Sequence, residues 1–141
     1  MYCAPHIDLP MVSVMRSKYL TYPEYHTSDD RIDTVVTSQG LEDSLKMHKA
    51  MINIIQNNCM PNALVLGEPQ LGRRNLYPMV STKGGSASVR TRLDLISYSD
   101  GTMSLLDIAE ECKVPFEVIL KEFNILKQHD VLEGIPIVHD C

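Results

Sequence analysis

The sequence predicts an α+β fold in which helices dominate and the strands are short. Two long stretches carry helical apolar periodicity, short alternating segments flank them, and prolines and glycines separate the stretches. With 44% hydrophobic and 22% charged residues among 141, the composition is that of a globular chain. We expect three parts: residues 1–60, a connector over 61–85 and a C-terminal module over 86–141.

The first part is predicted to form a strand, a loop and a helix. Residues 7–16 alternate apolar and small or polar side chains after Pro10, which indicates a half-buried strand over 9–16. A loop with the sequence YPEYHTSDD follows at 22–30, and Thr37 or Ser38 can then cap a helix with Glu42 and Asp43 in its first turn. That helix is expected to end at 57–58 and to bury one apolar stripe, formed by Leu41, Leu45, His48, Ile52 and Ile55.

The C-terminal module is predicted to form three helices and a wing. Ser104 and Asp107 have the spacing of a capping box at the start of the second helix, which ends near Cys112. Pro115 fits the first position of the third helix. Two short strands about Gly134 would form a hairpin, so the order is that of a winged helix-turn-helix. The buried face of the third helix is expected to consist of Val118, Ile119, Phe123 and Leu126.

The connector over 61–85 is interrupted repeatedly by proline and glycine. Within it, residues 63–66 are apolar and predict a short strand, and Arg73–Arg74 is interpreted as a solvated turn. Gly84–Gly85 is interpreted as a hinge, because no Lys-Ser/Thr pair of a phosphate-binding loop follows it.

The charge distribution bears on nucleic-acid binding. The net charge is −5, and residues 86–141 carry all of it, with five basic and ten acidic groups. The third helix sets Lys121 and Lys127 against Glu117, Glu122 and Asp130. Because phosphate contacts supply most of the non-specific affinity of DNA-binding proteins, we expect a protein-contact or dimerisation module, with a homodimer as one form. The alternative is a DNA-binding regulator in which Asn124, Gln128 and His129 read base edges.

Other patterns narrow the class of protein. No apolar run is long enough to cross a membrane. The start, MYCAPHIDLP, lacks the basic and apolar regions of a signal peptide, so we expect a cytoplasmic protein. The four cysteines lack CxxC spacing and are expected to be reduced, mostly buried thiols.

The loop at 22–30 contains several aromatic and ionisable side chains within nine residues. It combines two tyrosines, three carboxylates and His26. A zinc site needs three or four protein ligands, and the sequence offers no HExxH pair. By spacing alone, His26 is more simply explained as an ordinary surface histidine than as a ligand.

A family resemblance favours the interpretation of His26 as a metal ligand. The segment LPMVSVMR, the loop YHTSDD at 25–30 and the helix from Leu41 resemble the C-terminal end of co-catalytic zinc aminopeptidases. Together with the winged helix, four segments resemble a bacterial family of uncharacterised aminopeptidase-like proteins of that superfamily: YCAPHIDLP, MRSKY, YPEYHTS and GEPQLGRRNLYP. That family ends in a winged helix and is often associated with polysaccharide biosynthesis. The resemblance implies that residues 1–60 are the remnant of the C-terminal end of an α/β domain, although His6 stands where the family is expected to have glycine.

The resemblance also implies a chemistry for the parent protein. Two zinc ions would lower the pKa of a shared water to about 7, and a glutamate would act as general base on a peptide or amide substrate. His26 would be a zinc ligand, and Arg16, Tyr22 and Tyr25 would line the substrate pocket.

The strands that carry the other ligands and the catalytic glutamate are absent from this sequence. We therefore expect a fragment that is not catalytic alone, binds zinc weakly and has the rest of that domain as its partner. The further alternative is an interaction module whose parent has lost catalysis.

Overall fold

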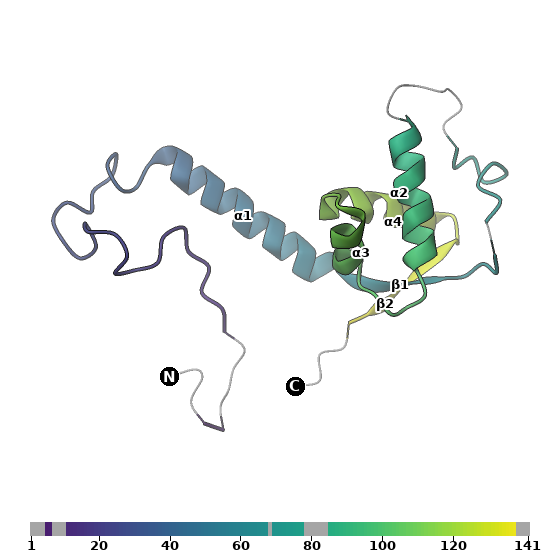
Figure 1. Ribbon diagram of the computed structural model, residues 1–141, viewed down its shortest axis with the longest axis horizontal. Helices are drawn as coiled ribbons and strands as arrows, with labels where there is room; N and C mark the ends of the chain where they lie inside the picture. The colour runs from purple at the N-terminus through teal and green to yellow at the C-terminus, as the bar shows by residue number, and fades with distance from the viewer. Residues whose placement is uncertain (1–4, 7–10, 68, 78–84, 138–141) are drawn as a thin grey trace. The chain divides into compact units, whose positions relative to one another are not determined.

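The computed structural model describes residues 5–6, 11–67, 69–77 and 85–137. Its elements follow the order α1 (Ser38–Asn57), β1 (Cys59–Ala63), α2 (Gly85–Tyr98), α3 (Leu105–Cys112), α4 (Phe116–Gln128) and β2 (Leu132–Pro136), all labelled in Figure 1. The chain divides into two compact units, Met1–Ile52 and Asn53–Cys141. We call them the N-terminal unit and the winged-helix unit and describe each by itself.

The expected strand over 9–16 is wrong for the part that the structure describes. Residues 11–16 have no strand structure, and 7–10 lie outside the described residues. A strand requires a neighbour for its N–H and C=O groups, and no described residue of the N-terminal unit belongs to a named strand. His6, at the position where glycine was expected, has a left-handed backbone (φ 72°), the conformation that favours glycine.

Helix α1 begins and ends close to the expected residues. Thr37 caps it, because its Oγ1 accepts a hydrogen bond of 3.1 Å from the Gly40 N–H. Two details were predicted wrongly. Glu42 and Asp43 lie beyond the first turn, which contains no acidic residue. The apolar stripe is exposed rather than buried, with exposed fractions of 62% for Leu41, 55% for Leu45, 53% for Ile52 and 76% for Ile55.

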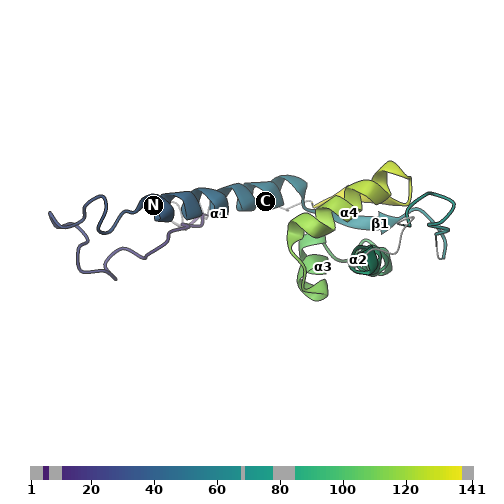
Figure 2. The same cartoon turned by 90° about the horizontal axis from the view of Figure 1, so that it is seen from above.

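The winged-helix unit is built around one hydrophobic core. Helix α4 contacts α2, α3 and β2. Figure 2 shows α2 end-on and α4 side-on, so these two helices cross steeply. This arrangement confirms the predicted winged helix-turn-helix. The residues at its centre are almost completely buried: Leu95, Leu105, Ile108, Ile119, Leu126, Val131 and Leu132.

The capping box at the start of α3 is confirmed. The Asp107 N–H donates to Ser104 Oγ (3.2 Å), and the Ser104 N–H donates to Asp107 Oδ2 (2.9 Å). The hydrogen bonds from the Ser104 hydroxyl and then from its N–H lower the pKa of Asp107. At the other end, Lys113 adopts a left-handed conformation (φ 55°) and donates to carbonyls of the last turn, which ends the helix.

The predicted hairpin about Gly134 is wrong. Strand β2 runs straight through Gly134 and pairs antiparallel with β1, placing Gly134 opposite Pro61. A Cβ at position 134 would lie 2.9 Å from Cys59 Sγ and 3.1 Å from Phe123 Cζ. The glycine therefore permits close packing in the sheet rather than a turn. On the other side of β1, the Gly101 N–H donates to the Pro61 carbonyl at 3.0 Å.

Most of the α4 prediction is confirmed. Ile119, Phe123 and Leu126 are buried, whereas Val118 is 39% exposed. Val118 precedes Ile119 by one residue, and a single step turns a helix by about 100° away from the buried stripe. Pro115 occupies the cap position, one residue before the first helical residue.

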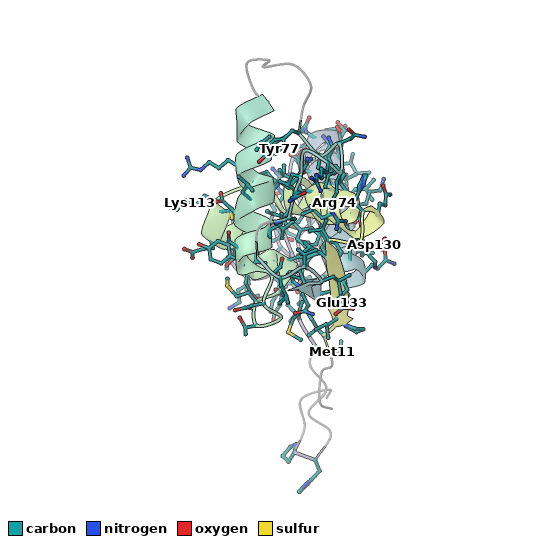
Figure 3. The ribbon with its side chains drawn as sticks, turned by 90° about the vertical axis from the view of Figure 1, so that its right-hand side faces the viewer. Met11, Arg74, Tyr77, Lys113, Asp130 and Glu133 are labelled. Carbon is teal, nitrogen blue, oxygen red and sulfur yellow. The ribbon has the colours of Figure 1, made fainter. Side chains whose placement is uncertain are left out.

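The described part of the connector, 61–67 and 69–77, belongs to the winged-helix unit. Residues 64–66 form no strand, because β1 ends at Ala63. Leu71 and Leu76 are buried in the core. Arg74 is not simply a solvated turn residue, since its Nη1 donates to the His129 carbonyl just after α4. Figure 3 shows Arg74 on the side of the unit where Asp130 lies. The hinge at Gly84–Gly85 lies partly outside the described residues.

Two further predictions concern the membrane and the cysteines. None of the helices in the described ranges is long and apolar enough to cross a membrane. Cys59 and Cys112 are free, half-buried thiols, and desolvation by burial raises the pKa of both. Cys3 and Cys141 lie outside the described residues.

Candidate functional site

The loop that precedes α1 is a series of turns held together by aromatic rings. The backbone N–H groups of Tyr25 and Thr27 donate to the carbonyls of Tyr22 and Glu24. The Tyr25 ring meets the Tyr22 ring edge-on, with 5.7 Å between centroids, and stacks on the His26 ring at 4.1 Å. His26 is exposed and has a left-handed backbone (φ 61°), so its position depends on this stack and on the turn.

The structure does not assemble a metal site around His26. Across the ranges that it describes, no three His, Cys, Asp or Glu side chains come close enough together to hold a metal ion. One histidine cannot satisfy zinc, which takes three or four protein ligands. The described residues of this chain therefore do not fit a zinc ion by themselves.

A pocket lies beside the first turns of α1, and two of the expected substrate-binding residues line it. Its volume is about 240 Å³. The guanidinium of Arg16 lies against buried Gly40, since a Cβ at position 40 would overlap with Arg16 Nη1. Tyr22 contributes a half-buried ring. The remaining lining residues are small polar or aliphatic: Ser17, Val35, Val36, Thr37, Leu41 and Ser44.

Tyr22 connects this pocket with the aromatic loop. Desolvation of its hydroxyl, and then the negative charge of Asp30, raise the pKa of Tyr22. Because its pKa is raised, the Tyr22 hydroxyl stays protonated at neutral pH.

The structure brings together some of the predicted site residues and separates others. Arg16 and Tyr22 share the pocket, and Tyr25 contacts Tyr22. His26 contacts Tyr25 and is not a lining residue of the pocket. Sequence reasoning missed Gly40 as a lining residue. A glycine inside the first turn of a helix costs stability relative to alanine, and that local cost was the available signal.

The third helix of the winged helix presents a different charge from the one its sequence implies. Glu122 is 4% exposed, and its Oε2 lies 2.7 Å from Arg92 Nε and 2.6 Å from Arg92 Nη2. Arg92 also donates to the Leu76 carbonyl. Glu122 therefore adds no free charge to the surface of α4, where the exposed charged residues are Glu117, Lys121 and Lys127.

Two family models match this chain, and the boundary between them lies near the end of α1. Residues 58–134, more than half of the chain, match the family described as winged helix-turn-helix. Residues 1–58 match a family described as a domain of unknown function (DUF4910).

Two relatives come from Clostridium acetobutylicum. One is provisionally named a polysaccharide biosynthesis protein with an aminopeptidase-like domain, and it is 35% identical over 136 residues, which cover 94% of this chain and 30% of the relative. The other is a crystal structure provisionally named a peptidase, with 30% identity and a TM-score of 0.76, covering 95% of this chain and 29% of that one.

The chain thus spans about three tenths of the length of the proteins it matches. Their names confirm the resemblance to aminopeptidase-like proteins that was inferred from the sequence motifs. The family match over 58–134 agrees with the packing of α2, α3 and α4 against the β1–β2 sheet. The chain therefore belongs to the winged helix-turn-helix family.

Proposed function

We propose that this chain works as one portion, the C-terminal one, of a zinc-dependent aminopeptidase-like hydrolase and is not catalytic alone. In this proposal the N-terminal unit completes the catalytic domain, and the winged helix provides protein contacts. The substrate is a peptide or an amide, and the protein acts in the cytoplasm. The association of one relative's name with polysaccharide biosynthesis supports a role near that process.

The exposed apolar stripe of α1 carries the proposal. Leu41, Leu45 and Ile52 are each more than half exposed, although they lie on one helix face. Apolar surface in contact with water costs roughly 25 cal/mol per Å², so such a face favours a covering partner. Because the relatives are much longer than this chain, we assign the covering role to the rest of the aminopeptidase-like domain.

His26 is proposed as one zinc ligand contributed by this chain. Its imidazole is exposed and stacked on Tyr25, so its position is defined while the ring remains accessible. Arg16, Tyr22 and Tyr25 are proposed to contact the substrate. We assign the other zinc ligands to the rest of the aminopeptidase-like domain, because no cluster of the described residues can hold the ion.

The winged helix is proposed to bind protein, in the simplest form a second copy of the chain. The outer face of α4 forms a shallow depression of about 410 Å³. Acidic, basic, amide and aliphatic groups line it: Glu117, Leu120, Lys121, Asn124, Ile125 and Gln128. A face that mixes charges and apolar groups suits a protein partner better than a uniformly negative phosphate backbone.

One chimera tests the catalytic proposal. This chain would replace the matching portion of the longer C. acetobutylicum relative, and zinc content and hydrolysis of an amino-acid amide would be measured. We expect the chimera to retain zinc and activity and His26→Ala to lower both, with His48→Ala as the matched control on an exposed histidine of α1. Full zinc content and activity in the His26→Ala chimera would reject the proposed role of His26.

A further inference from the structure

From the pocket beside α1, we infer that Arg16 binds a carboxylate group whose carbon chain lies on the aliphatic wall of the pocket. This inference rests on the proposed role of Arg16 and Tyr22 in substrate binding and names the chemical class that they recognise. Three properties of the pocket support it: the state of the guanidinium, the charge of the lining residues, and the division between polar and aliphatic walls.

The Arg16 guanidinium lies beside the first turn of α1 and has no polar partner in the described part of the chain. It forms no hydrogen bond or ion pair there. It lies against Gly40, where any larger residue would overlap with it. Guanidinium groups bind carboxylates through two parallel hydrogen bonds, which are about twice as strong as bonds between neutral groups.

The polar side of the pocket combines the positive charge of Arg16 with hydroxyl groups. Gly40 donates its N–H to Thr37 Oγ1, which leaves the Thr37 hydroxyl proton free to act as a donor. The Ser44 hydroxyl donates its proton to the Gly40 carbonyl. None of the described residues that line the pocket carries a carboxylate. A ligand that accepts several hydrogen bonds and carries negative charge satisfies this arrangement.

The aliphatic wall favours a carboxylate with an apolar group over a bare inorganic anion. Val35, Val36 and Leu41 form that wall. The volume of about 240 Å³ lies below the ~300–1,000 Å³ of sites for drug-sized ligands. The pocket therefore suits one residue-sized group, such as an aliphatic residue with a free carboxylate.

Titration of the 141-residue chain, followed by NMR of its backbone amides, tests this inference with three probes. N-acetyl-leucine carries the carboxylate, N-acetyl-leucinamide replaces it with a neutral amide of the same shape, and inorganic phosphate lacks the aliphatic group. We expect N-acetyl-leucine to shift the Gly40 amide saturably and to bind about tenfold or more tightly than the amide. Phosphate should bind more weakly than N-acetyl-leucine, because it gains nothing from the aliphatic wall.

Two variants change the guanidinium, and one serves as a control. Arg16→Gln should weaken N-acetyl-leucine binding about tenfold or more. Gly40→Ala should weaken it as well, because the new Cβ displaces the guanidinium, while alanine favours the helix. Arg31→Gln removes another exposed arginine of the same unit, one that does not line the pocket, and should leave binding unchanged.

Three results would overturn the inference: no saturable shift with N-acetyl-leucine, equal affinity for the acid and the amide, or unchanged binding in Arg16→Gln. Phosphate binding as tightly as N-acetyl-leucine would overturn the assignment of the aliphatic wall. None of these measurements depends on zinc or catalysis. A failure here is therefore distinguishable from a failure of the chimera to hold zinc through His26.

Discussion

The two units of this chain differ in how they bury apolar side chains. In the winged-helix unit, Leu95, Ile108 and Ile119 are completely buried in a shared core. In the N-terminal unit, Gly40 is the one residue classed as buried among those described. Large apolar side chains there, such as Leu20 and Ile32, are each 77% exposed.

This difference indicates that one unit is complete and the other is not. A three-helix core with a paired sheet satisfies its own backbone and apolar groups. A loop and one amphipathic helix bury much less apolar area, so turns, ring contacts and local hydrogen bonds order the N-terminal unit instead of a core. The N-terminal unit should therefore gain stability when it contacts a partner, and the winged helix should not require one.

We expect the largest loss of stability when the buried Arg92–Glu122 ion pair is broken. Glu122→Ala leaves the Arg92 guanidinium buried without its carboxylate and should destabilise the winged helix by about 3–5 kcal/mol in urea denaturation. Replacing both partners, as in Arg92→Met with Glu122→Leu, should cost less than the single change. Glu117→Ala on the exposed face is the control, and an equal loss in it would contradict the assignment.

A matched pair of truncations compares the two units directly. Ile119→Ala opens a cavity in the core and should cost about 2–5 kcal/mol of unfolding free energy. Leu45→Ala removes a side chain that is 55% exposed and should change it by less than about 0.5 kcal/mol. Similar losses in the two variants would show that the α1 stripe is covered within this chain.

A smaller effect is expected at the capping box. Ser104→Ala should destabilise the winged helix by about 1 kcal/mol at pH 7. Because the bonds from Ser104 lower the pKa of Asp107, this stabilisation is present above the unfolded value of about 3.9 and is lost as the pH falls through the folded value. Thermal melts from pH 7 to pH 2 should therefore show the wild type and the variant converging at acidic pH. A constant difference would count against the carboxylate's role.

We expect the isolated chain to bind zinc only weakly. Because His26 is one ligand without neighbours in the described residues, calorimetry should show no sub-micromolar zinc binding. Tight binding that disappears in His26→Ala would mean that the chain assembles a metal site by itself.

Local patterns predicted the features that depend on neighbouring residues. The Ser104–Asp107 capping box, the end of α1 and the buried stripe of α4 all follow from spacings of a few residues. The pairing of β1 with β2 could not be predicted in this way, because it joins Cys59 to Pro136 across the whole module. Proline is uncommon in strands, and Pro61 within β1 is accepted because each strand of a two-stranded sheet has an open edge.

The candidate site shows the same limit. Sequence reasoning selected Arg16 and Tyr22, but their pocket depends on a contact between Arg16 and Gly40 that no local spacing encodes. Likewise, Glu122 counted as a surface acid until its pairing with Arg92 was seen. Charge sums over a helix cannot identify which charges are buried.

Amide hydrogen exchange of the 141-residue chain, at a concentration where it is monomeric, tests the contrast between the units most directly. We predict that residues 41–52 of α1 exchange through local opening and are much less protected than residues 119–126 of α4, which exchange only on global unfolding. Equal, strong protection of the two helices would show that the N-terminal unit is complete in this chain and would contradict the account.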